Sequence, residues 1–399
     1  MIKIAFASFG CKVNRAETDD FIRELGDYGA EKSKLEEADF IIINSCAVTA
    51  KAVSDVEKYI RCLKSRYSAQ IVLTGCIGEL EQQGADIILT NADKVSLLEK
   101  IGLNKTEAKG LEASTGTTRA FVKIQDGCDR FCTYCIIPSL RGAPVSVSMK
   151  KIEEDVKKYV KAGHKEVVLT GVNTALYEPN LVVLLERLAG LPGDFRLRLT
   201  SFYPESITKE LITFIKESGS KICPHFHLSV QSGSSETLAR MGRNYSAQKV
   251  AEAVSLIRLA LPEAGIGADF IAGFPGETEE QFEESCRLAL ELGFDYIHSF
   301  PYSQRPGTKA ACFDGQLSES EKKKRAAVLR DISKDLKTAA AIKLKGQTLR
   351  VLTEKGGKGH ADNYFTVKTP GLPPGIFADM RITDFDENLN LEAYRIIMP

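Results

Sequence analysis

The feature that most constrains this chain is a regular alternation of strand-like and helical segments through its middle region. Six apolar, β-rich runs start roughly 30 to 45 residues apart with helical patterns between them, which is the period of a βα unit. Six such units predict a partial (βα) barrel, with its active site at the C-terminal ends of the strands. The strand-like runs are 121–124, 166–170, 196–199, 225–230, 267–272 and 296–300. Helices are expected at 150–162, 205–218, 247–261 and 279–292, followed by a long charged helix at 318–345.

The N-terminal part of the chain carries a second α/β pattern. Its strand-like runs are continuously apolar and are separated by helical segments, which indicates a parallel sheet buried on both faces. The expected strands are 2–7, 40–44, 71–74 and a weaker 87–89, and the expected helices are 16–26, 49–67 and 94–101.

Beyond Gly346 the pattern changes to short alternating strands, broken by Gly-Gly, Pro-Gly and Pro-Pro turns. A small all-β barrel is the natural interpretation, with strands at 348–353, 364–368, 380–384 and 391–396. Residues 105–119 are small, polar and Gly-containing, which is typical of a linker. We therefore expect an α/β protein with three domains, at 1–107, 114–345 and 346–399.

Composition excludes several classes of protein. No run approaches the roughly 18 apolar residues of a membrane span, and the first residues lack the apolar core of a signal peptide, so we expect a cytoplasmic location. In the cytosol the ten cysteines are not expected to form disulfides, so some of them serve as metal ligands, nucleophiles or core residues. The 53 basic and 53 acidic residues cancel, which argues against binding nucleic acid by overall charge alone.

Cys128, Cys132 and Cys135 form a C-x3-C-x2-C motif directly after the first barrel strand. Three thiolates at this spacing can hold three irons of a 4Fe–4S cluster, and no fourth cysteine follows at a suitable distance for a ferredoxin or structural zinc site. The open iron can chelate the amino and carboxylate groups of S-adenosylmethionine. The alternative is three buried core cysteines, which the intervening Asp129 and Arg130 make implausible.

Cys11, Cys46 and Cys76 are far apart in sequence, yet each comes shortly after an expected parallel strand. Loops at the carboxyl ends of parallel strands line one edge of the sheet, where helix N-termini can also lower thiol pKa values. These three cysteines could therefore ligate a second cluster, and scattered structural cysteines are the alternative.

The remaining cysteines and the barrel histidines are less informative. Cys62, Cys223, Cys286 and Cys312 are interpreted as core or surface thiols, and His225, His227 and His298 as interior polar residues rather than metal ligands. Loops after three barrel strands are rich in glycine and polar residues, which suits contacts with a ribose or an amino acid head group.

With these motifs in place, the chain resembles the methylthiotransferases of the radical S-adenosylmethionine superfamily over nearly its whole length. The resemblance implies an N-terminal domain with the Cys11, Cys46 and Cys76 cluster, a radical domain with the Cys128, Cys132 and Cys135 cluster, and a C-terminal TRAM domain, an OB-like barrel that binds RNA. Residues expected to contact S-adenosylmethionine are Tyr134, Gly171, Asn173, Gln231 and Asp269.

The segments GCKVN (10–14), NSCAVT (44–49), KIQDGC (123–128), YCIIP (134–138) and HSFPYSQRPGT (298–308) resemble most the branch that acts on threonylcarbamoyladenosine at tRNA position 37. This resemblance implies two 4Fe–4S clusters, S-adenosylmethionine, the tRNA anticodon loop, and an electron donor such as flavodoxin or ferredoxin. The alternatives are an enzyme for isopentenyladenosine in tRNA, one for a ribosomal protein, and an iron–sulfur RNA-binding redox sensor without turnover.

One basic segment bears on RNA binding. From Glu321 to Lys345 there are nine Lys or Arg and three Asp or Glu, a net charge of +6, so Lys322, Lys323, Lys324 and Arg325 are candidate phosphate contacts. A solvated helix face is the alternative. The chain departs from the family pattern at 77–79 and 143–144, and its C-terminal domain is short.

Overall fold

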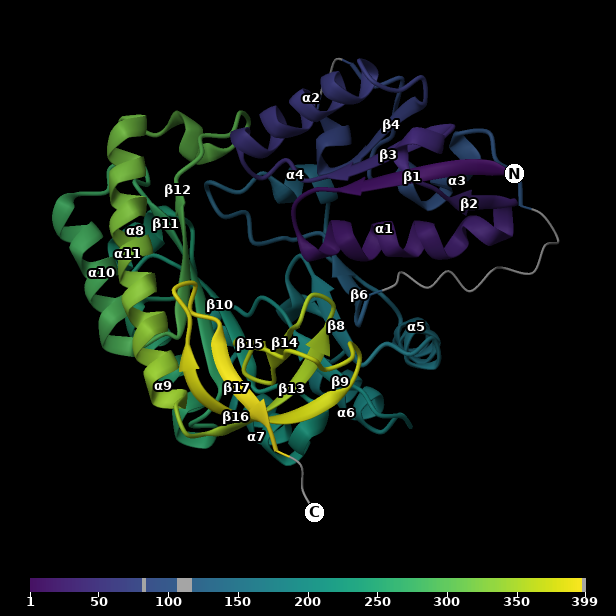
Figure 1. The fold of residues 1–399 in the computed structure, drawn as a ribbon. Coiled ribbons are helices and arrows are strands. Elements are labelled where there is room, and N and C mark those ends of the chain that lie inside the picture. Colours follow the sequence, from purple (N-terminus) through teal and green to yellow (C-terminus); the bar gives the residue numbers. More distant parts are fainter. Residues whose placement is uncertain (81–83, 106–116, 397–399) are drawn as a thin grey trace.

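A computed structural model describes residues 1–80, 84–105 and 117–396. It contains an N-terminal α/β unit, a middle unit of strands ringed by helices, and a C-terminal β unit, drawn in purple to blue, teal to green, and yellow in Figure 1. Most of the expected linker, 106–116, lies outside the described residues, as do the expected domain boundaries at 107 and 114. Arg119, expected at the end of the linker, begins the first strand of the middle unit.

The N-terminal unit is a five-stranded, all-parallel sheet with the order β2-β1-β3-β4-β5. Continuous apolar runs form its central strands, and α1 and α2 cover opposite faces, as predicted for a sheet buried on both sides. The sequence pattern missed β2, a three-residue edge strand. The elements are β1 (Ile2–Ser8), α1 (Lys12–Glu24), β2 (Ala30–Lys32), β3 (Phe40–Ser45), α2 (Ala50–Lys64), β4 (Gln70–Gly75), β5 (Ile87–Ile88) and α3 (Leu97–Lys100).

The middle unit has the six parallel strands that the sequence predicts. They form two sheets, β6-β8-β9 with the short antiparallel β7 at its edge, and β10-β11-β12. Two isolated bridges, Leu197 to Ile222 and Phe202 to Leu228, connect β9 with β10 and complete a partial barrel. The strands are β6 (Arg119–Asp126), β7 (Val145–Ser146), β8 (Glu166–Gly171), β9 (Arg196–Leu199), β10 (His225–Gln231), β11 (Gly265–Ala272) and β12 (Tyr296–Pro301).

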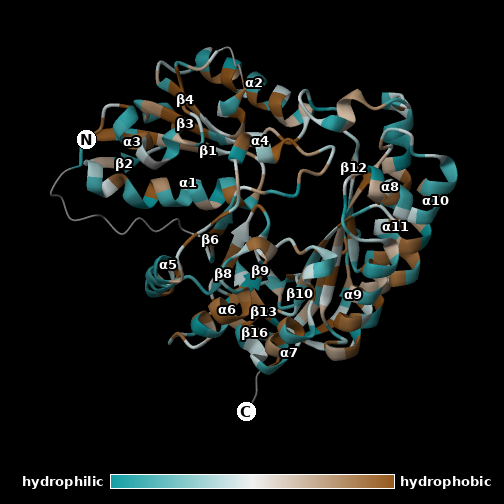
Figure 2. Cartoon of the chain, turned by 180° about the vertical axis from the view of Figure 1, so that it is seen from behind, coloured by the Kyte–Doolittle hydropathy of each residue, from teal (hydrophilic) through white to brown (hydrophobic). Residues whose placement is uncertain are grey.

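Helices ring the outside of this barrel and bury one apolar face against it, so that brown and teal bands alternate along α9 and α10 in Figure 2. The expected helix at 205–218 is shorter, because Thr208 caps a new helix start by accepting a hydrogen bond from Leu211 N. The helices are α4 (Ile137–Arg141), α5 (Met149–Lys161), α6 (Leu181–Ala189), α7 (Lys209–Glu217), α8 (Ser235–Arg240), α9 (Ala247–Ala260), α10 (Glu279–Leu292) and α11 (Glu319–Leu344).

The C-terminal unit is a closed five-stranded barrel with the order β13-β14-β15-β17-β16. The expected all-β barrel is confirmed, and the sequence pattern missed only β14, which is short and contains a glycine. Its strands are β13 (Thr348–Glu354), β14 (Lys358–Ala361), β15 (Thr366–Lys368), β16 (Phe377–Phe385) and β17 (Leu391–Arg395). Within the described ranges, no helix combines the length and apolarity needed to cross a bilayer.

The C-terminal barrel is fixed to the strand starts of the middle barrel by buried charges. Glu166 at the start of β8 accepts hydrogen bonds from Arg196 Nε at 2.7 Å and from Arg198 Nε at 3.0 Å. The same guanidinium groups reach across to the loop after β14, where Arg196 pairs with Asp362 at 2.5 Å and Arg198 donates to the Asp362 carbonyl at 2.9 Å. The loop therefore closes the end of the barrel opposite its strand C-termini.

Candidate active site

The first cysteine triad lies at one edge of the N-terminal sheet. Cys11 precedes α1, Cys46 follows β3, and Cys76 begins the turn after β4. Because β1, β3 and β4 are adjacent and parallel, their carboxyl ends bring the three thiols close enough to interact electrostatically. Gly10 has φ of 105°, and a side chain there would place its Cβ 2.2 Å from that of Cys46. Only glycine permits this approach.

Hydrogen-bond donors surround this triad. Arg141 Nε donates to Cys76 Sγ at 3.0 Å, and the backbone N–H of Val48 donates to Cys46 Sγ at 3.4 Å. Two buried nitrogens near the triad, Arg141 Nη2 and Arg305 Nε, have no hydrogen-bond acceptor among the described residues. Arg305 also interacts electrostatically with Cys46. Three sulfurs beside cationic, unpaired donors fit an anionic iron–sulfur group.

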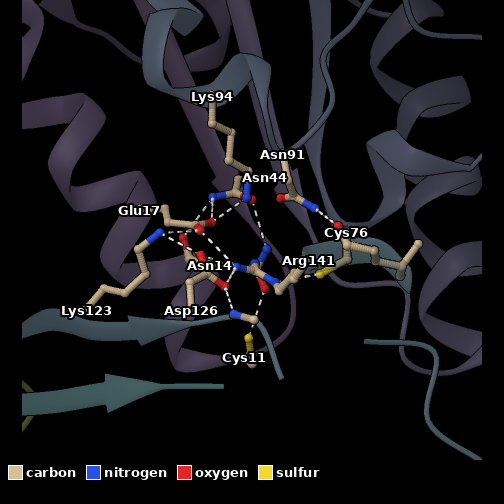
Figure 3. A network of polar contacts seen from close by, with 12 residues as sticks. Cys11, Asn14, Glu17, Asn44, Cys76, Asn91, Lys94, Lys123, Asp126 and Arg141 are labelled. Carbon is tan, nitrogen blue, oxygen red and sulfur yellow. Dashed lines mark hydrogen bonds and ion pairs between the residues drawn. The ribbon is translucent and has the colours of Figure 1, made fainter. Parts of the chain in front are cut away.

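Arg141 also ties this triad to the middle barrel, as Figure 3 shows. Its Nη1 donates to Glu17 at 3.0 Å and to Asp126 at 2.8 Å, and Glu17 further pairs with Lys94 at 2.6 Å and Lys123 at 3.1 Å. Burial by itself raises the pKa of Glu17, but the three cations outweigh it and the net shift is strongly downward. The network therefore stays ionised and links α1 to β6 and α4.

The second triad lies in the loop between β6 and α4. Cys128 and Cys132 are buried and Cys135 is half-buried, and the three interact electrostatically. The backbone N–H of Cys128 donates to the Gly142 carbonyl at 3.0 Å. Gly127 has φ of 69°, and a Cβ there would lie 2.0 Å from the Ala143 carbonyl oxygen, so the loop folds this tightly only with glycine.

An arginine stands beside the second triad as well. Arg243 Nη1 lies 3.6 Å from Cys132 Sγ, and its guanidinium packs 4.6 Å from the Tyr203 ring centroid and 5.9 Å from that of Tyr134. Tyr134 also meets Phe274 edge-on at 6.4 Å. Tyr134 thus forms part of an aromatic wall behind the triad.

Each triad contains a thiol that burial keeps protonated. Desolvation raises the pKa of Cys46 to about 12, and the nearby Cys11 and Cys76 add to the shift. Desolvation also raises the pKa of Cys135 to about 12, although a hydrogen bond from the backbone N–H of Ile137 lowers it in part. Since a thiolate is the ligating form, metal binding at these sites must release protons.

The other residues expected to bind S-adenosylmethionine fall into two groups. Gly171 and Gln231 end β8 and β10, and Asn173 lies just beyond Gly171, all on the side of the barrel that carries the second triad. The backbone N–H of Asn173 donates to Gln125, while its own buried amide nitrogen has no acceptor among the described residues. An unpaired donor at this edge fits a polar ligand.

Asp269 lies deeper in the barrel and already has partners. His227 Nε2 is 2.8 Å and His298 Nδ1 is 3.4 Å from its Oδ1, and the Tyr296 hydroxyl approaches His227 at 3.2 Å. Burial raises the pKa of Asp269, and the hydrogen bonds from both histidines reverse this to a net lowering. His225 and His227 are buried, as expected for interior polar residues, but the expectation is wrong for His298, which is exposed on the last barrel strand. The ligand atoms of His227, Asp269 and His298 lie close enough to hold a metal ion.

Of the four candidate phosphate contacts on α11, two are exposed and two are buried. Lys323 and Lys324 are exposed. Lys322 is buried and pairs with Glu319 at 2.8 Å, and Arg325 is buried and pairs with Glu277 at 2.9 Å. Burial of these two side chains removes them from any phosphate-contacting surface, because the helical period of α11 turns them toward the barrel.

Sequence reasoning missed the charged residues that organise both triads. Glu17 and Arg141 lie on different helices, and Arg243 and Arg305 lie in loops, so neither periodicity nor spacing relates them to a particular cysteine. The only available signal was position, since Arg141 follows the second triad within one short helix. Of the remaining cysteines, Cys223 is buried, as expected for a core thiol.

Two family models match the N-terminal and the middle unit of the chain separately. Residues 122–289 match the radical SAM superfamily, and residues 3–98 match a family described as uncharacterized protein family UPF0004. Among solved structures, the chain is similar to the radical S-adenosylmethionine methyltransferase TsrM from Kitasatospora setae, with a TM-score of 0.56, 13% identity, and coverage of 76% of this chain and 74% of that one. At this identity the likeness concerns the fold alone.

The relatives are more specific. The chain is 37% identical to the threonylcarbamoyladenosine tRNA methylthiotransferase MtaB of Chlamydia pneumoniae, over 90% of each chain. It is 33% identical to MtaB of Bacillus subtilis, over 93% of this chain and 91% of that protein. It is also 34% identical to the tRNA-2-methylthio-N(6)-dimethylallyladenosine synthase of Natranaerobius thermophilus, over 89% of this chain and 86% of that protein. The chain therefore belongs to the methylthiotransferase family of radical SAM enzymes.

Proposed function

We propose that this enzyme transfers a methylthio group to C2 of N6-threonylcarbamoyladenosine at position 37 of tRNA. The observation that carries the proposal is the bridge between the two triads. Arg141 stands on the helix that directly follows the Cys128, Cys132 and Cys135 loop, and it donates to Cys76 of the other triad. Two sites joined through one side chain suit a reaction that needs a radical and a sulfur source at the same substrate atom.

The cofactors proposed are S-adenosylmethionine and a 4Fe–4S cluster on each triad. Bound there, the clusters supply the electron for reductive cleavage of S-adenosylmethionine and the sulfur that is transferred. The protein's own residues ligate and orient these groups. Arg141 and Arg243 would stabilise the charge on the ligating sulfurs, Tyr134 would pack beside the second triad, and the unpaired Asn173 amide would be free to donate a hydrogen bond to S-adenosylmethionine.

The electron donor is proposed to be a flavodoxin- or ferredoxin-type protein, and the RNA contact to be the anticodon loop. The second candidate substrate, N6-dimethylallyladenosine in tRNA, is supported by the relative from Natranaerobius thermophilus. Nucleoside mass spectrometry on tRNA incubated with the reconstituted enzyme separates these outcomes. We expect 2-methylthio-N6-threonylcarbamoyladenosine. Methylthiolation of the dimethylallyl nucleoside alone would assign the second substrate, and unmodified tRNA would refute both.

Iron analysis tests the number of clusters. Anaerobically reconstituted enzyme is expected to hold about eight irons per chain, because each triad binds one four-iron cluster. Changing Cys11, Cys46 and Cys76 to Ala should leave about four irons and preserve S-adenosylmethionine cleavage while abolishing methylthio transfer. Changing Cys62, Cys286 and Cys312 to Ala is the matched control and should leave the iron content unchanged. Four irons in the unaltered enzyme would contradict the two-cluster proposal.

Salt dependence tests the role of α11 in RNA binding. Changing Lys323 and Lys324 to Ala should weaken tRNA binding and reduce the slope of log K against log salt by about 1 for each phosphate that is no longer neutralised. The exposed Lys209 and Lys216 on α7 provide a matched double Ala control. Equal slopes for both double variants would remove α11 from the RNA footprint.

A further inference from the structure

Lys12 is a half-buried cation that lacks an acidic partner. It is the first residue of α1 and follows Cys11 of the first triad. Among the described residues, no carboxylate forms an ion pair or hydrogen bond with its ammonium group, whereas Lys94 and Lys123 both pair with Glu17. Holding a cation away from water without a counter-charge is unfavourable unless a ligand supplies that charge.

The acidic group in the surroundings of Lys12 is already engaged. Asp269 interacts with Lys12 electrostatically, but its oxygen is held by His227 at 2.8 Å and by His298 at 3.4 Å. The position of Lys12 makes its unpaired positive charge still less favourable, because Lys12 lies at the N-terminus of a thirteen-residue helix that has no acidic residue in its first turn. A helix N-terminus disfavours a cation and favours an anion.

The Lys12 ammonium lies over an aromatic ring from the C-terminal barrel. Its Nζ is 5.9 Å from the ring centroid of Tyr364, which stacks on His225 at 4.5 Å and on His360 at 5.3 Å. The guanidinium of Arg198 packs 5.0 Å from the same ring. Tyr364 is held at φ of 76°, a strained conformation for a bulky residue that persists only when its surroundings enforce it.

This ring also borders a cavity of about 310 Å³ between the two barrels. The cavity is lined by residues of β12, α11, β14 and the loop after β14, including Tyr296, His298, His360 and Tyr364. Lys337, and not Lys12, is the lysine that lines this cavity; the Tyr364 ring links the two, because it borders the cavity and lies beside the Lys12 ammonium. An aromatic ring beside an unpaired ammonium suits a planar ligand with a carboxylate.

We propose that Lys12 binds the carboxylate of the threonylcarbamoyl group of the substrate nucleoside, which packs against Tyr364. This assignment rests on the proposed function, and it explains how the enzyme would distinguish threonylcarbamoyladenosine from dimethylallyladenosine. A threonylcarbamoyl group carries a carboxylate that pairs with the ammonium, whereas a dimethylallyl group carries none and leaves the cation desolvated. A site built to pair a charged group rejects an analogue that lacks it.

Binding of three anticodon stem–loop RNAs to the full, cluster-loaded enzyme tests this assignment. The RNAs carry threonylcarbamoyladenosine, dimethylallyladenosine or adenosine at the target position. We expect the unaltered enzyme to prefer the first RNA, and Lys12→Gln to lower that affinity by about 10-fold or more while leaving the other two unchanged. Lys12→Arg should restore part of the preference. Lys58→Gln, at an exposed position on α2, is the matched charge control.

Iron content and thermal melting of each variant establish that the fold and the clusters are intact. If Lys12→Gln weakens all three RNAs equally, or lowers the iron content, Lys12 serves general electrostatics or the neighbouring cluster and the assignment fails. If Lys12→Gln keeps the full preference while the enzyme still modifies threonylcarbamoyladenosine, the assignment fails and the proposed function stands. If the unaltered enzyme modifies only dimethylallyladenosine, the proposed function itself fails.

Discussion

Replacement of Glu166 by Ala is expected to lower the free energy of unfolding by about 3–5 kcal/mol. Glu166 is fully buried, and its two oxygens accept hydrogen bonds from Arg196 and Arg198, which are also buried. Removing the carboxylate leaves two guanidinium groups without their shared counter-charge at the junction of the two barrels. Chemical denaturation followed by circular dichroism measures the change.

The pH dependence of stability gives a second signature of Glu166. Burial raises the pKa of this carboxyl, but attraction to Arg198 and Arg196 outweighs burial and lowers it far below its ordinary value. A depressed pKa in the folded state contributes stability above the unfolded-state pKa of about 4.3, and this contribution is lost as the pH falls further. Glu166→Gln should therefore lose less stability on acidification than the unaltered chain.

The control for Glu166 is Glu153→Ala, because Glu153 pairs with Lys157 on the surface of α5. Surface pairs contribute little, so its unfolding midpoint should barely move. A comparably small change for Glu166→Ala would mean that the buried cluster does not hold the barrels together.

Replacement of Arg141 by Met is expected to weaken iron retention at the first triad by about 10- to 100-fold, the usual effect of losing a group that supports metal ligands. Arg141 is a positioning residue, since it donates to Cys76 while anchoring itself on Glu17 and Asp126. Without it, Cys76 loses its donor and the bridge between the two triads is broken. The rate of iron loss to a chelator measures the effect, and four of the eight irons should leave faster.

Arg141→Lys distinguishes positioning from charge alone. A lysine keeps the charge but cannot reach Cys76, Glu17 and Asp126 together, because it lacks the planar fork. We expect Arg141→Lys to recover only part of the iron retention. Arg61→Met on the exposed face of α2 is the matched control and should retain iron normally. Full retention in Arg141→Met would show that the network of Figure 3 is structural only.

The elements that sequence predicts well are those whose signal is local. Continuous apolar runs identified the central strands of the N-terminal parallel sheet, since burial on both faces requires such runs. Short strands such as β2 and β14 were missed, because a few residues with polar or glycine content carry no periodicity. The charge of α11 was visible in sequence, but which of its lysines face solvent depended on packing against the barrel.

The sequence by itself determined the α/β fold class, the three-part order of the chain and the positions of both cysteine triads, because strand period and motif spacing are local properties. Only the tertiary structure decided what surrounds those cysteines. Arg141 meets Glu17, and Lys12 meets Tyr364, across elements far apart in the chain, and both contacts depend on distances of a few ångströms between separate units. Long-range electrostatic partners leave no pattern in the order of residues, so they appear only once the chain is folded.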